Sequence, residues 1–119
     1  MPTLSVLTTR ADFLAANRGL RVARPGFVLL VHPNQAQSMR FGITVTKKIG
    51  NAVVRNRMKR RFRELLRAAL PTLGLPEHDH VLIGRDGGLE RDFAQLQIEL
   101  AAALARAAAG KGDPPRKRK

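Results

Sequence analysis

Residues 41–67 of the chain read FGITVTKKIGNAVVRNRMKRRFRELLR, and this stretch decides the fold. Its first part belongs to Met39–Thr46, where apolar residues alternate with polar residues or glycine, the two-residue period of a half-buried β-strand. A helix over about Ala52–Leu70 is predicted to follow, because Asn51 can cap its first turn and Pro71 is a natural stop. A strand, a basic loop and a long helix are therefore expected in direct succession.

The predicted helix has two different faces. Its apolar side chains fall on one stripe at helical spacing: Val54, Met58, Phe62, Leu65 and Leu66. The opposite face carries Asn56, Lys59, Arg60, Arg63 and Arg67. One side is expected to pack against a sheet while the other presents a row of cations. Arginine predominates in that row, which favours bidentate contacts to phosphate groups.

The charge of the chain is concentrated around this helix. Lys and Arg total 22 against 9 Asp and Glu, which gives a formal net charge of +13. Between Lys47 and Arg67 there are nine basic residues and a single acid, Glu64, and the terminal Arg116–Lys119 adds four more cations. A charge this one-sided repels itself unless a polyanion binds, so nucleic acid is the first expected partner.

A basic amphipathic helix is also compatible with three other roles. It can bind a membrane surface, act as the target of a calmodulin-like protein, or simply be solvated. Two features argue against a role at a membrane surface: the apolar stripe contains no Trp, and the flanking strands are expected to cover it. No apolar run approaches the ~20 residues that span a bilayer, and the N-terminus lacks the pattern of a secretory signal.

The remaining elements follow from periodicity and turn residues. We expect a helix at Arg10–Arg18 capped by Thr9, strands at 20–24, Phe27–Val31 and His80–Arg85, and a last helix at about Glu90–Ala108. The strands Phe27–Val31 and Met39–Thr46 should be antiparallel neighbours, the strands flanking the long helix parallel neighbours, and the helices should cover one face of the sheet. This is one domain over residues 1–110, followed by a disordered basic tail at 111–119.

The sequence shows no catalytic set or metal site. The absence of cysteine excludes disulfides, thiolate metal sites and a Cys nucleophile, and it fits a reducing cytoplasm. His78, Asp79 and His80 are adjacent, but neighbouring residues at the start of a strand point to opposite faces, so we predict loop or surface histidines without a metal. The scattered carboxylates form no visible pair for acid–base work.

The stretch 41–67 closely resembles the central signature of the bacterial ribonuclease P protein family. The matching positions are Thr46-Lys47-Lys48 at the end of the strand, then Gly50-Asn51-Ala52-Val53, Arg55-Asn56-Arg57, Lys59-Arg60 and Arg63-Glu64. Weaker agreement extends to Arg10, Asp12-Phe13, Phe27-Val28-Leu29 and the final strand and helix. The resemblance covers most of the chain, and its many fixed spacings make it specific.

The resemblance implies an α+β fold: a two-layer α/β sandwich in the order α-β-β-β-α-β-α, with a mostly antiparallel central sheet and a left-handed crossover through the long helix. It implies a subunit that works with ribonuclease P RNA to remove the 5′ leader of precursor tRNA endonucleolytically in the cytoplasm. The RNA would carry out the chemistry with mainly RNA-bound Mg²⁺, and the protein alone would be inactive. No membrane and no obligate protein partner are expected. A ribosomal or assembly-type RNA-binding protein without a processing role is the alternative.

The resemblance also assigns residues to two RNA contacts. Those expected to bind the catalytic RNA are Lys47, Lys48, Asn51, Arg55, Asn56, Arg57, Lys59, Arg60, Arg63 and Arg67. Those expected to line a cleft for the leader are Arg10, Phe13, Asn17, Val28 and Leu30, with Phe27 and Leu29 in place of the last two in the other register. Asn17 and Leu30 stand where many relatives carry aromatic residues, so stacking should count for less here. Ordinary core packing is the alternative for Phe13.

Overall fold

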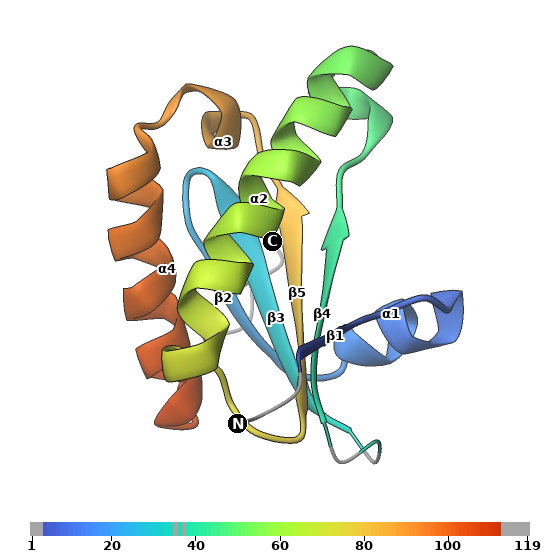
Figure 1. Cartoon of the computed structure of the whole chain (residues 1–119), viewed down its shortest axis with the longest axis vertical. Helices are drawn as coiled ribbons and strands as arrows, with labels where there is room; N and C mark the ends of the chain where they lie inside the picture. The colour runs from blue at the N-terminus through green and yellow to red at the C-terminus, as the bar shows by residue number, and fades with distance from the viewer. Residues whose placement is uncertain (1–3, 35, 37, 113–119) are drawn as a thin grey trace, which may run out of the picture.

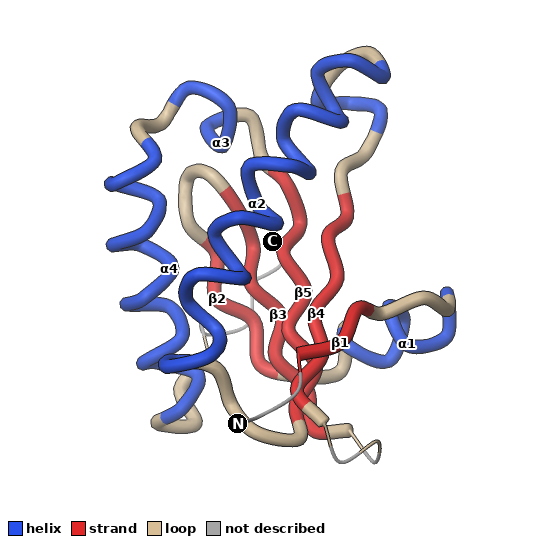
Figure 2. The backbone as a smooth tube through the Cα atoms, in the orientation of Figure 1, coloured by secondary structure: helices blue, strands red, loops and turns tan. Residues whose placement is uncertain are grey.

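The protein is built on one five-stranded sheet with strand order β1-β4-β5-β3-β2 (Figures 1 and 2). The computed structural model describes residues 4–34, 36 and 38–112. Of the tail 111–119 that is predicted to be disordered, residues 113–119, with the basic Arg116–Lys119, lie outside the described residues. The elements are β1 (Leu4–Val6), α1 (Arg10–Ala16), β2 (Leu20–Ala23), β3 (Phe27–Pro33), β4 (Met39–Thr44), the short 3-10 helix η1 (Lys47–Ile49), α2 (Ala52–Leu73), β5 (His78–Gly84), α3 (Gly87–Glu90) and α4 (Phe93–Ala108).

The centre of the sheet is β5, which lies between β3 and β4. Its pairing with β4 is parallel, as predicted for the strands that flank the long helix, and its pairing with β3 is antiparallel. The prediction that β3 and β4 are antiparallel neighbours was therefore wrong, because β5, the strand that follows α2, lies between them. Together with the parallel pair β1–β4, this makes the sheet mixed rather than mostly antiparallel. The α+β class is confirmed, and the handedness of the crossover stays a prediction.

The two faces of the sheet are covered by different helices. Phe27, Leu29 and Val31 of β3 belong to the large core under α2 and α4, and those two helices lie side by side across this face (Figure 1). Val28 and Leu30 belong to a smaller core on the other face, together with Ala16 of α1. We expected all helices on one face. A strand with five consecutive buried residues, Phe27–Val31, needs cover on both faces, and α1 provides the second.

The long helix α2 begins as predicted and ends later. The Asn51 side chain accepts a hydrogen bond from the Val54 N–H at 3.0 Å, which confirms the cap. At the other end the helix passes Pro71 and runs to Leu73. Proline lacks the N–H that would bond the Arg67 carbonyl, but the hydrogen bonding resumes after it, since the Gly74 N–H bonds the Leu70 carbonyl at 2.9 Å. The buried residues are Met58, Phe62, Leu65, Leu66 and Leu70. Four of the five residues of the predicted apolar stripe are thus buried, and the fifth, Val54, is half-buried.

The last helix is shorter than predicted. The chain takes an extended conformation at Arg91, with φ −66° and ψ 141°, which separates the short α3 from α4. The helix expected from about Glu90 therefore starts at Phe93. Within the described residues, none of the helices is both long enough and apolar enough to cross a membrane.

Candidate nucleic-acid interface

A chain of ion pairs fixes α1 to the sheet. Thr9 caps the helix as predicted, since its hydroxyl oxygen accepts a hydrogen bond from the Asp12 N–H at 3.2 Å. The Asp12 carboxylate faces Arg40 of β4, with Oδ2 and Nη1 3.4 Å apart. Arg40 in turn donates from Nε to Asp79 Oδ1 at 2.7 Å and from Nη2 to Asp79 Oδ2 at 2.9 Å. Asp79 is only 2% exposed, and its hydrogen bond raises the pKa of Arg40.

The ring of Phe13 lies against the backbone of β4 where a glycine leaves room for it. A Cβ atom added at Gly42 would stand 2.5 Å from Phe13 Cε1 and 2.6 Å from Cζ. Phe13 is half-buried and packs on the smaller core that holds Leu30 and Val81. The two interpretations of this residue are therefore compatible: one part of its surface packs on the core and the other part lines a cleft.

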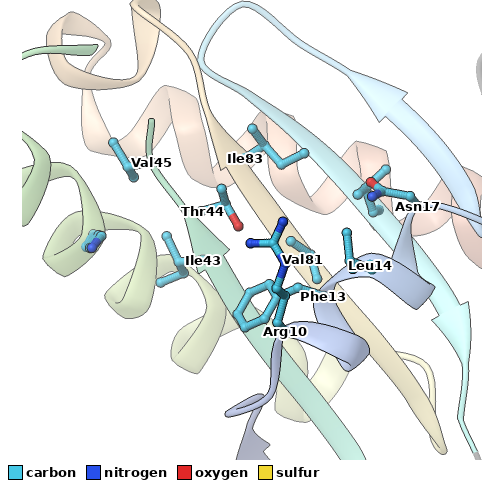
Figure 3. Close-up of a pocket in the computed structure, with 11 residues that line it drawn as sticks. Arg10, Phe13, Leu14, Asn17, Ile43, Thr44, Val45, Val81 and Ile83 are labelled. Carbon is cyan, nitrogen blue, oxygen red and sulfur yellow. The ribbon is translucent and has the colours of Figure 1, made fainter. Parts of the chain in front are cut away.

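The cleft lies between α1 and the sheet and has a volume of about 530 Å³. Figure 3 shows Arg10 and Phe13 of α1 facing Thr44 and Val81 of the sheet across it. The residues that line the cleft are Arg10, Phe13, Leu14, Asn17, Leu30, Ile43, Thr44, Val45, Lys59, Val81 and Ile83.

Four of the five predicted cleft residues line this cleft: Arg10, Phe13, Asn17 and Leu30. The fifth, Val28, lies on the same face but is buried in the smaller core and does not contribute to the lining. Phe27 and Leu29 face α2 and α4, which selects the Val28–Leu30 register. The sequence did not point to Leu14, whose apolar side chain is 52% exposed at the cleft, or to the lining residues of β4 and β5.

The cations of α2 and η1 form no ion pair with the acidic residues that the structure describes. Of the ten residues predicted to contact the catalytic RNA, Arg55 and Lys59 are half-buried, whereas the exposed ones are Lys47, Lys48, Asn51, Asn56, Arg57, Arg60, Arg63 and Arg67. In the described part of the chain, the ion pairs join Arg40 to Asp12 and Asp79, and Arg91 to Glu99. None of them involves a cation of α2 or η1, so this surface is left with a strong positive potential.

One cation of α2 is used inside the protein. Arg61 donates a hydrogen bond to the Arg91 carbonyl oxygen, and its guanidinium lies 5.8 Å from the centroid of the Phe93 ring. Arg61 therefore attaches the start of α4 to α2 and belongs to the packing of the fold. The predicted interface did not include this residue.

The cluster His78–His80 has a structural role. His80 is fully buried, and its ring accepts a hydrogen bond from the Leu75 N–H at 3.1 Å while Nδ1 lies 3.1 Å from the Arg40 carbonyl oxygen. Burial lowers the pKa of His80. Its prediction as a loop or surface residue was wrong, whereas Asp79 and His80 do point to opposite faces as expected. Among the described residues, no three His, Asp or Glu side chains are grouped to hold a metal ion.

These features define a class of protein: a small α+β domain in which an unpaired basic helix lies next to a cleft with an aromatic residue in its wall, an arrangement suited to RNA. The family model for Ribonuclease P matches residues 1–108. The ribonuclease P protein component of Erythrobacter litoralis is 73% identical over 115 residues, which are 97% of this chain and 95% of that protein. The chain therefore belongs to the ribonuclease P protein family.

More distant relatives agree. The ribonuclease P protein component of Gluconacetobacter diazotrophicus is 48% identical over 85% of this chain and 89% of its own length. The solved structure of the Staphylococcus aureus RNase P protein superposes with a TM-score of 0.72 at 32% identity, covering 86% of this chain and 94% of that one. The Thermotoga maritima protein gives 0.73 at 32% identity, covering 84% and 94%.

The family gives the function at a coarse level. The chain is a protein component of a tRNA-processing ribonuclease and works with ribonuclease P RNA. This confirms the resemblance seen in residues 41–67 and favours it over a ribosomal or assembly-type protein. The prediction of an RNA partner from the charge of the chain is supported in the same way.

Proposed function

We propose that the protein holds the single-stranded 5′ leader of precursor tRNA in the cleft beside α1, while the exposed cations of α2 and η1 bind ribonuclease P RNA. These contacts together promote endonucleolytic removal of the leader, which leaves the mature 5′ end of the tRNA. The observation that carries the proposal is the juxtaposition of the two surfaces. A cleft of about 530 Å³ lies on one side of β4. On the other side lies a helix whose cations form no ion pair with a described acid.

The lining of the cleft suits an unpaired RNA strand. Phe13, Leu14 and Ile83 offer apolar surface on which bases can rest, and single-stranded RNA is commonly held on such surfaces. Arg10 supplies a cation to the same cleft for the phosphate backbone, and the Asn17 amide offers hydrogen bonds to base edges. With one aromatic residue in the lining, hydrogen bonds and charge should contribute more to leader binding than stacking does.

The chemistry is assigned to the RNA subunit. Asp12 and Asp79 are engaged by Arg40, and Glu64 is the single carboxylate of α2 and is exposed. None of these three carboxylates is therefore available as one of a pair for hydrolysis. Mg²⁺ prefers several oxygen ligands, and this surface presents mainly guanidinium and ammonium groups. We therefore propose that the Mg²⁺ ions of the holoenzyme are bound mainly by the RNA. Bound there, they would activate water and stabilise developing charge. We propose the cytoplasm as the place where the holoenzyme works.

Reconstitution tests the proposal. The protein is mixed with a bacterial ribonuclease P RNA at low magnesium, and removal of the leader from precursor tRNA is measured. We expect faster cleavage than with the RNA alone and no cleavage by the protein alone. If six to eight phosphates are contacted, the logarithm of the affinity should fall with the logarithm of the salt concentration at a slope of about −4 to −7. Cleavage without RNA, or no stimulation by the protein, contradicts the proposal.

A further inference from the structure

The cleft continues beyond Phe13, around the edge of the sheet. A second hollow of about 150 Å³ shares Phe13, Ile43 and Lys59 with the cleft and extends the cavity to Arg63 of α2. The two hollows form one path that starts beside α1, passes the outer edge of β4, and ends at α2. Lys59 lines both of them, so it lies where the surface of the cleft meets the surface of the basic helix.

This path exists because the edge of β4 is only half covered. The short strand β1 pairs with Met39–Phe41, and its last contact is the hydrogen bond from the Leu7 N–H to the Phe41 carbonyl oxygen at 2.8 Å. The chain then leaves the sheet to form α1. In the described structure, the part of β4 from Gly42 onward pairs with β5 alone. Side chains of α2 can therefore reach past this edge toward the other face of the sheet.

Lys59 and Arg63 are placed to act together on a strand of phosphates. They are four residues apart on α2, which puts them on the same side of the helix about 6 Å apart along its axis. Neither forms an ion pair with a described acidic residue. Arg57 and Arg60 belong to the same turns of the helix but are exposed and line neither hollow. The cations of α2 are thus divided between two sides of the helix.

We infer that Lys59 and Arg63 bind the ribose-phosphate backbone of the leader where it passes the open edge of β4, and that Arg57 and Arg60 bind the catalytic RNA. One helix then contacts both RNA molecules, the substrate along the side that faces the cleft and the ribozyme along the exposed side. This assignment rests on the proposed function, because it requires that the cleft holds the leader. It assigns Lys59 and Arg63 to the substrate instead of the catalytic RNA, to which the resemblance assigned them.

The experiment uses four single variants of the full chain in the reconstituted holoenzyme. Lys59→Gln and Arg63→Gln remove the two cations on the cleft side, and Arg57→Gln and Arg60→Gln are the matched controls on the exposed side. Glutamine keeps helix propensity and length, and a thermal melt verifies that each variant is folded. For each protein we measure its affinity for ribonuclease P RNA, and the affinity of the holoenzyme for precursor tRNA with a long leader and with a leader truncated next to the cleavage site.

Each cleft-side variant should weaken binding of the long-leader substrate about fivefold to tenfold and lower the salt slope of that affinity by about one. Binding of the truncated substrate and of the catalytic RNA should change less than about twofold. The control variants should weaken binding of the catalytic RNA, without dependence on leader length. The inference is overturned if Lys59→Gln and Arg63→Gln behave like the controls, or if their losses are equal for both substrates. If the wild-type holoenzyme itself binds both substrates equally, the assignment of the leader to the cleft fails instead.

Discussion

Replacing Gly42 by alanine tests the contact that shapes the cleft. The added Cβ would stand 2.5 Å from Phe13 Cε1 and 3.1 Å from Leu7 Cδ1, whereas carbon atoms in contact are separated by about 3.5–4.0 Å. The ring of Phe13 must therefore move by roughly 1 Å. Overpacking of this kind costs about 1–3 kcal/mol. Because Gly42 is not among the glycines with positive φ, alanine regains about 0.5–1 kcal/mol from the strand backbone. The free energy of unfolding should fall by up to about 2.5 kcal/mol.

Two assays report on this variant: urea unfolding of the protein and binding of long-leader precursor tRNA to the holoenzyme. Both stability and leader affinity should decrease, because the displaced ring no longer forms the same surface. The double variant Gly42→Ala with Phe13→Leu has a smaller side chain facing the new methyl group, so it should regain stability without regaining leader affinity. If Gly42→Ala is as stable as the wild type and binds the leader equally well, the ring of Phe13 is not held against β4 and the reasoning is refuted.

Three further predictions concern charge and burial. Arg40→Ala leaves the Asp79 carboxylate buried without its counter-charge, so the free energy of unfolding in urea should fall by about 3–5 kcal/mol. Arg91→Ala, which breaks the more exposed ion pair with Glu99, should lower it by about 1 kcal/mol. Equal losses would contradict a special role of the ion pairs that fix α1 to the sheet. Because burial lowers the pKa of His80 from its ordinary 6.5, the unfolded chain takes up that proton first. The contribution of His80 to the free energy of unfolding should be fully present above about pH 6.5. It should decrease as the pH falls below that value, by at most about 1.4 kcal/mol per pH unit. In unfolding curves measured over a series of pH values, His80→Gln should abolish this decrease. Sulfate should raise the melting temperature by binding the exposed cations of α2, with a stabilisation of about 2.7 kcal/mol at 100 times its dissociation constant; no shift would mean that this surface is not an anion site.

Local signals in the sequence were enough to predict α2 and its two faces. The cap by Asn51, the buried stripe that includes Met58 and Phe62, and the exposed Arg57 and Arg60 all depend on residues within a few turns of one helix. The same holds for the Thr9 cap of α1. Spacing along one element fixes which side chains share a face, so no knowledge of the rest of the fold was needed.

The order of the strands was not predictable in this way. Nothing near Phe27–Val31 or Met39–Thr46 indicates that a strand some forty residues later lies between them, because hydrogen bonds between strands are made by backbone groups common to all residues. The strand β1 has three residues, too few to show a period. The division of helices between the two faces follows from the same non-local arrangement.

Residues of the site could be predicted where they belong to a family motif. They could not be predicted where they depend on contacts between residues that lie far apart in the sequence. Arg10, Phe13 and Asn17 were expected in the cleft from the resemblance, and the structure places them there. The anchor that fixes α1 joins Asp12, Arg40 and Asp79, which are 28 and 39 residues apart along the chain. A polar residue in a strand has the same local pattern whether it faces solvent or a partner from another element, so this network had no signal in the sequence.

The central position of β5 constrains when the nascent chain can fold during translation. The ribosome releases β1 to β4 and all of α2 before residues 78–84, the segment that joins the outer strand pairs. Until then β2–β3 and β1–β4 are two separate ribbons, and isolated two-stranded ribbons are marginally stable in water. Folding is therefore postponed until the ribosome has released the chain at least as far as Gly84, the end of β5. A chain cut short before β5 has no means of assembling the sheet, so the protein cannot be divided at α2 into two halves that each fold.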